Sequence, residues 1–220
     1  MLSTLLIFAL AATPNPNPRS ITMVGDAKLT FRPNQALATF LLTTTYRDVA
    51  GVRKAGDDKL AKLLRACREA GVEPRNIVIN EAGLSPEYRG NEVIGQVLNR
   101  SLLLTITDMA KLDDALTAAV RAGATQSGPV YLQNTEHRVY ETKVRVLAAA
   151  SARERARGVI EALGAKLGLP SSVNDLTPVV ENLPAGTFNV PPEGPVVTSF
   201  ANRELTVTSQ LTVVFDVESP

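Results

Sequence analysis

The feature that most constrains the fold of this 220-residue chain is a regular alternation of apolar and polar side chains near both of its ends. Alternation with a period of two is typical of strands that bury one face. We therefore predict half-buried strands over residues 21–31 and 203–217. Their apolar positions are Ile21, Met23, Ala27, Leu29 and Phe31 in the first, and Leu205, Val207, Leu211, Val213, Phe215 and Val217 in the second.

The segments between these ends predict further strands and three helices from their periodicity and from Gly, Pro and Asp residues at their borders. The predicted strands are residues 36–46, 76–84, 93–107, 128–133 and 173–180, with a loop over residues 85–92. The predicted helices are residues 48–70, 108–122 and 136–167. The third is rich in alanine, and its expected apolar seam is Val146, Ala149, Ala152, Ala156, Ile160, Leu163 and Leu167.

This order of elements predicts an α+β fold, with a mostly antiparallel sheet and helices packed on one face of it. Two strand–helix–strand units each contain a helix that ends in Ala-Gly, at Ala70-Gly71 and Ala122-Gly123. We interpret them as two candidate split β-α-β halves, followed by the long third helix.

The first 19 residues differ from the rest of the chain. Residues 5–12 are apolar, and Ala9-Leu10-Ala11 has the small-x-small form of a signal-peptidase site, although no Lys or Arg precedes it. The run is shorter than the roughly 20 residues of a membrane-spanning helix. We expect residues 1–19 to be a signal-like segment with a Pro/Asn tether, and residues 20–218 to be one domain that contains a Pro/Gly-rich loop at residues 183–202.

Composition excludes several kinds of function. A net charge of +1 gives no basic surface for nucleic acid, and one Cys and one His cannot build the common zinc sites. Cys67 falls on the apolar face of the first helix, where we expect an inert thiol, and His137 is expected at the surface. Glu81, Glu87 and Glu92 fall near one loop, where carboxylates are usually solvated.

Several segments together resemble the SIMPL-domain family. They are ITMVGDAKLTFRPNQA at residues 21–36, EAGVEPRNIVINEAGLSPEY at residues 69–88, VIGQVLNRSLLLTITDMAKLDDAL at residues 93–116 and ALGAKLGL at residues 162–169. The opening departs from the family pattern at Ala27, where Gly is usual, and at Asn34, where Asp is common. Gly95-Gln96 stands where the family often has Gly-Tyr. The resemblance implies a periplasmic or envelope α+β protein that self-associates, is linked to stress tolerance and has no catalytic residues to carry over.

We therefore expect a non-enzymatic exported protein, periplasmic or secreted, that acts as a homo-oligomer or through contacts with other proteins. We assign no catalytic residue, cofactor or metal, and we expect no nucleic-acid partner and no integral membrane span. The alternative is a small-molecule binder or an unrecognised enzyme with a pocket near Glu81, Tyr88 and Glu92. A further alternative keeps the apolar N-terminal segment as an uncleaved membrane tether.

Overall fold

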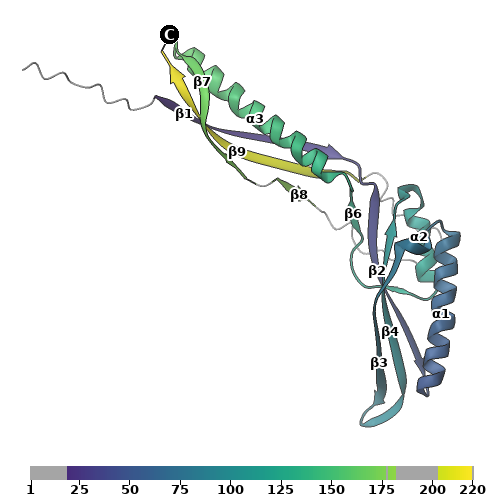
Figure 1. Ribbon diagram of the computed structural model, residues 1–220. Helices are drawn as coiled ribbons and strands as arrows, with labels where there is room; N and C mark the ends of the chain where they lie inside the picture. The colour runs from purple at the N-terminus through teal and green to yellow at the C-terminus, as the bar shows by residue number, and fades with distance from the viewer. Residues whose placement is uncertain (1–18, 177, 182–202, 220) are drawn as a thin grey trace, which may run out of the picture. The chain divides into compact units, whose positions relative to one another are not determined.

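The computed structural model describes residues 19–176, 178–181 and 203–219 (Figure 1). These residues form helices and mostly antiparallel strands, which confirms the α+β class. They divide into two compact units. The first contains residues 19–27, 146–176 and 210–219, and the second contains residues 28–145, 178–181 and 203–209. The segments predicted as a signal and as a Pro/Gly-rich loop, residues 1–18 and 183–202, lie outside the described residues.

The second unit is built on one five-stranded sheet. Its strands are β2 (Gln35–Tyr46), β3 (Ile77–Arg89), β4 (Glu92–Ile106), β5 (Thr125–Gln126) and β6 (Tyr131–Gln133). The order is β3-β4-β2-β5, and β6 also pairs with β2. Since β4 is antiparallel to both β2 and β3, these two strands run parallel with β4 between them. The same relation joins β4 and β5 across β2, so the two split β-α-β halves are present.

Helices α1 (Val49–Glu69) and α2 (Leu112–Arg121) pack on this sheet and on each other (Figure 1). The even-numbered residues of β2 and β4 supply most of the sheet side of this core, including Phe40, Leu42 and Leu102. The helices contribute Val52, Leu63, Cys67, Leu116 and Ala119, all buried. One face of the sheet is therefore the core of the unit.

The borders of α1 and α2 follow local rules of capping. The Asp48 carboxylate accepts a hydrogen bond from the Gly51 amide at 2.8 Å, which satisfies an amide that the first turn of α1 leaves unpaired. Gly71 follows α1 with a φ of +89°, a backbone conformation that glycine adopts without steric cost. The short turns η1 (Pro74–Asn76) and η2 (Met109–Lys111) then lead into β3 and α2.

The first unit combines parts of β1 (Ser20–Phe31), β9 (Leu205–Glu218) and α3 (His137–Ala162) with β7 (Lys166–Asp175). Its strands are ordered β1-β9-β7, and β8 (Val179–Glu181) pairs with the part of β9 that belongs to the second unit. The core of the first unit is a cluster of Ala148, Ala152, Ala156, Leu211, Val213 and Phe215. Ala side chains on α3 allow the helix to lie close to β1.

Four predicted boundaries are wrong. The strand predicted over residues 128–133 is confined to β6 at Tyr131–Gln133, and β5 at Thr125–Gln126 was not predicted. Residues 85–92 are not a loop, because β3 continues to Arg89 and β4 starts at Glu92. The strand predicted over residues 173–180 is two strands, β7 and β8. Helix α3 ends at Ala162, not at residue 167, because Gly164 adopts a φ of +74° and the chain turns into β7.

The predicted seam of α3 is also partly wrong. Val146 is 63% exposed and Leu163 is 75% exposed, and Ala149 is exposed as well. The buried residues recur at steps of four, which keeps them close to one line along a helix of 3.6 residues per turn. They are Val144, Ala148, Ala152, Ala156 and Ile160.

Substitution of Gly25 tests the close approach of β1 to α3. A Cβ atom at Gly25 would overlap the carbonyl oxygen of Ala148 and lie 2.7 Å from the Cβ of Ala152. Gly25→Ala should therefore lower the free energy of unfolding by about 2 kcal/mol, as overpacked substitutions do. Gly158→Ala, on α3, is the control, because no atom lies within 4 Å of its added Cβ. Urea unfolding measures both, and a Gly25→Ala protein as stable as the wild type would contradict the packing.

Candidate functional site

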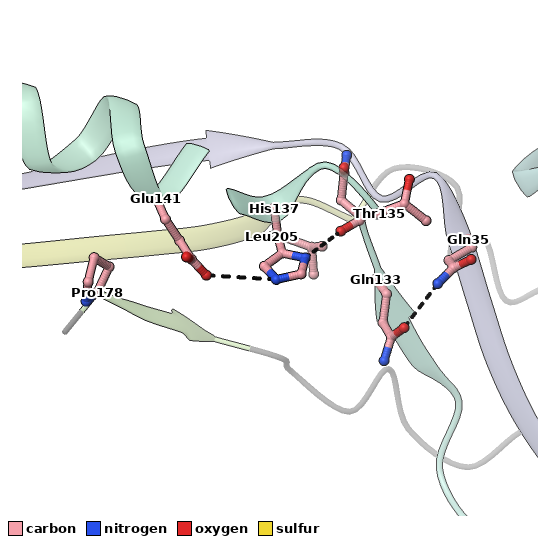
Figure 2. Close-up of a pocket in the computed structure, with 8 residues that line it drawn as sticks. Gln35, Gln133, Thr135, His137, Glu141, Pro178 and Leu205 are labelled. Carbon is pink, nitrogen blue, oxygen red and sulfur yellow. Dashed lines mark hydrogen bonds and ion pairs between the residues drawn. The ribbon is translucent and has the colours of Figure 1, made fainter. Parts of the chain in front are cut away.

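A polar cavity of about 370 Å³ lies at the start of α3 in the second unit (Figure 2). Side chains from β2, from the segment after β6 and from the first turns of α3 converge on it. Its lining residues are Gln35, Gln133, Asn134, Thr135, His137, Glu141, Pro178 and Leu205. The volume lies in the range of small-molecule sites, although such sites are usually more apolar.

The segment before α3 is held by two asparagines. The Asn134 side-chain amide donates to the Arg32 carbonyl at 2.7 Å, and its oxygen accepts from the Glu136 amide at 2.8 Å. Asn34 and Thr135 form a reciprocal pair, with Asn34 Nδ2 donating to Thr135 Oγ1 at 2.8 Å and the Thr135 amide donating to Asn34 Oδ1 at 3.0 Å. These bonds tie the wall of the cavity to the turn between β1 and β2.

Two side-chain pairs define the chemistry of the cavity. Gln35 Nε2 donates to Gln133 Oε1 at 3.0 Å, which leaves the Gln133 amino group and the Gln35 carbonyl able to bind a ligand. His137 lies with Nδ1 3.1 Å from the Asn134 carbonyl oxygen and Nε2 3.9 Å from a Glu141 carboxylate oxygen (Figure 2). The imidazole therefore lies next to a carbonyl and a carboxylate oxygen, and these polar groups suit the cavity to binding a polar molecule.

The structure does not bring together the residues predicted to form a pocket. Tyr88 pairs with Val93 and Glu92 with Arg89, so these two residues are neighbours near the hairpin end, whereas Glu81 pairs with Ser101 about 23 Å further along β3. Tyr88 is 62% exposed at the hairpin end. The side chain of Glu81 is not among those described.

Sequence reasoning missed the cavity, although it placed His137 correctly at the surface. His137 is half-exposed and lines the cavity together with Glu141. The spacing of four residues between His137 and Glu141 on a predicted helix was the one local signal of this pair. The two glutamines come from strands about a hundred residues apart and meet only because β2 pairs with β6.

Burial shifts the pKa of two titratable groups, Cys67 and Asp113. Cys67 lies in the core, as expected, and burial raises the pKa of its thiol to about 11. Burial and the neighbouring charge of Asp114 raise the pKa of Asp113. Within the described part of the chain, no group of three His, Cys, Asp or Glu residues is arranged to hold a metal ion.

The sheet of the second unit also presents a face opposite α1 and α2, which we call the open face. It consists of the odd-numbered residues from Gln35 to Thr45 on β2 and from Val97 to Thr105 on β4, which the pairing register places on one side. None of these side chains is charged. Their partial exposure alternates with the buried even-numbered residues, so no described element packs tightly over this face.

These observations describe an α+β protein with two antiparallel sheets, an open face whose β2 and β4 residues are uncharged, and a polar cavity. No helix among the residues described has the length and apolar character needed to cross a membrane. Residues 21–215 match the model of the SIMPL family, described as a protein of unknown function (DUF541). The chain belongs to this family.

Curated relatives in bacteria are similar to most of the chain. The 26 kDa periplasmic immunogenic protein of Brucella melitensis is 22% identical over 179 residues, which cover 77% of this chain and 72% of that protein. Its counterpart in Brucella abortus gives the same figures. The uncharacterized protein YggE of Edwardsiella ictaluri is 24% identical over 170 residues, covering 75% of this chain and 71% of that protein.

Thiol labelling tests the environment of Cys67. A thiol with a raised pKa and no exposed surface should react with a maleimide or an aromatic disulfide only when the protein opens. In native buffer at pH 8 we expect labelling at least about a hundredfold slower than in denaturant, where the thiol returns to its ordinary pKa. Labelling at equal rates in the two conditions would place Cys67 at the surface.

Proposed function

We propose that this protein is a non-enzymatic periplasmic or secreted protein that acts by self-association or by contacts with other proteins. The observation that carries the proposal is the absence of charged side chains from the β2 and β4 residues of the open face, since depletion of charged residues is typical of the centre of protein interfaces. The distance of Glu81 from Tyr88 and Glu92 along the β3–β4 hairpin and the burial of Cys67 support a role without catalysis. The link to stress tolerance rests on family resemblance alone.

The location outside the cytoplasm is supported by two observations. Two Brucella relatives bear the name periplasmic immunogenic protein. The apolar run at residues 5–12, followed by a Pro/Asn tether, has the length of the apolar part of a secretory signal. Fractionation of cells that produce the full-length chain separates a released protein from one that stays tethered to the membrane.

Light scattering coupled to size-exclusion chromatography tests self-association directly. Over a series of concentrations, we expect a mass that is a multiple of the chain mass of 23.5 kDa and that falls only on strong dilution. Chromatography in high salt is the control, because an interface without charges should be insensitive to ionic strength. If the measured mass is that of one chain at all concentrations, self-association is excluded, and only contacts with other proteins remain as the proposed function.

The cavity at the start of α3 favours a second candidate function, the binding of a small polar molecule. Its volume of about 370 Å³, its Gln35–Gln133 amide pair and its His137–Glu141 pair supply donors and acceptors on one wall. This replaces the location near Glu81, Tyr88 and Glu92 as the place where a ligand would bind.

A thermal-shift screen with amino acids, sugars and small carboxylic acids tests this second function. A compound that binds only the folded chain should raise the melting temperature in proportion to the logarithm of its concentration. Glu141→Gln should abolish the shift, because it removes a charge at the cavity wall. Glu92→Gln at the hairpin end should leave the shift unchanged. A shift that Glu141→Gln does not alter would come from another site.

A further inference from the structure

We infer that the cavity at the start of α3 takes a small aliphatic amine, whose ammonium group pairs with the Glu141 carboxylate. This inference rests on the second proposed function, the binding of a small polar molecule, and assigns it a class of ligand. It follows from the hydrogen bonds that the cavity wall already makes and from the charges and apolar groups that line it.

The hydrogen bond of His137 determines which nitrogen of its ring can accept. Nδ1 lies 3.1 Å from the Asn134 carbonyl oxygen, and because a carbonyl only accepts, Nδ1 carries the hydrogen of this bond. In the neutral ring Nε2 then presents a lone pair. Nε2 lies 3.9 Å from Glu141 Oε1, which is too far for a direct hydrogen bond (Figure 2). An ammonium nitrogen about 2.8 Å from each of these two acceptors would fit beside them.

The other polar groups of the wall are either already used or available to a ligand. The Asn134 side chain is used, since it donates to the Arg32 carbonyl and accepts from the Glu136 amide. Gln35 donates to Gln133, which leaves the Gln35 carbonyl as a further acceptor and the Gln133 amino group as a donor. These groups suit a ligand with several N–H or O–H donors and an acceptor, such as an amine that also carries a hydroxyl group.

The charge of the cavity favours a cation over an anion. The Glu141 side chain is only 24% exposed, and none of the described residues that line the cavity is a Lys or an Arg. Arg138 and Arg145 are three and four residues from Glu141 on α3, and neither is among these lining residues. A carboxylate ligand would bring a second negative charge next to Glu141, whereas an ammonium group gains a charge-assisted hydrogen bond where water is partly excluded.

A metal ion suits the cavity less well than an ammonium group. Zinc and similar ions usually take three or more ligands from the protein. His137 and Glu141 supply two, and the described residues contain no group of three His, Cys, Asp or Glu that could hold such an ion. An ammonium group needs only hydrogen-bond acceptors and a negative charge, and both are present.

The apolar part of the lining provides for the carbon chain of the ligand. Leu205 and Pro178 are buried residues that line the cavity together with the polar groups. Methylene groups that contact them gain free energy by leaving water. The volume of about 370 Å³ is large enough for a chain of several carbon atoms, so the ligand is a short aliphatic amine and not ammonium itself.

Three probes with the same carbon chain and the same hydroxyl end test the inference. Aminobutanol carries an ammonium group at its other end, butanediol a second hydroxyl group and hydroxybutyrate a carboxylate. Isothermal titration calorimetry of the full chain measures each dissociation constant, in phosphate buffer because Tris is itself an amine. We expect aminobutanol to bind at least about tenfold more tightly than butanediol, and hydroxybutyrate to bind least.

Two variants identify the charge that the amine contacts. Glu141→Gln removes the charge but keeps the length of the side chain, so aminobutanol and butanediol should then bind with equal affinity. Glu154→Gln removes the same charge from an exposed site on α3 in the first unit, and it should keep the preference for the amine. Circular dichroism and melting temperatures check that both variants are folded.

The possible results separate this inference from the second proposed function. Butanediol or hydroxybutyrate bound as tightly as aminobutanol, or a preference for the amine that Glu141→Gln retains, would overturn the amine while the binding of a small polar molecule stands. If no probe binds, the amine is also overturned, and the thermal-shift screen decides whether the second function falls with it. A preference for aminobutanol that is lost in Glu141→Gln and kept in Glu154→Gln is the result that we expect.

Discussion

The pairing of β2 with β4 determines which side chains form the core of the second unit and which lie on the opposite face of its sheet. Its register runs without interruption from Ala36 opposite Ile106 to Tyr46 opposite Gln96. A slip of one residue would turn Phe40 and Leu42 out of the core and bring Thr39 and Thr43 into it. The same pairing places α1 and α2 over the apolar side and gathers the uncharged odd-numbered residues of β2 and β4 on the open face. The core and the candidate interface are thus two results of one register.

Elements with strong local signals could be predicted from the sequence. The alternation in β9 and the capping of α1 by Asp48 and Gly71 depend only on neighbours along the chain. The outer half of the β3–β4 hairpin could not be predicted, because Pro86 and Gly90 are local signals of a loop. Pairing with β4 supplies the hydrogen bonds that keep residues 85–89 extended, and this pairing has no local signature. The end of α3 was missed because Gly164, not the apolar period, stops the helix.

The candidate sites show the same division between local and distant information. Glu81, Tyr88 and Glu92 are close in sequence, but an extended hairpin separates residues that a compact loop would gather. The cavity does the opposite, since Gln35 and Gln133 are far apart in the chain and directly opposite each other in the β2–β6 ladder. The lack of charge on the β2 and β4 residues of the open face became visible only from the register of these two strands. Both features therefore emerge only from the strand order.

The burial of Cys67 has a consequence for the lifetime of the protein. The folded chain offers no thiol to its surroundings, whereas any opening of α1 away from the sheet exposes one. In an oxidising environment, exchange of the exposed Cys67 thiolate with a small-molecule disulfide, which releases the other half as a thiolate, would place a bulky group where α1 must repack. The unit would then stay open until the mixed disulfide is reduced. The fraction of chains that carry a mixed disulfide at Cys67 would therefore report how often α1 has opened.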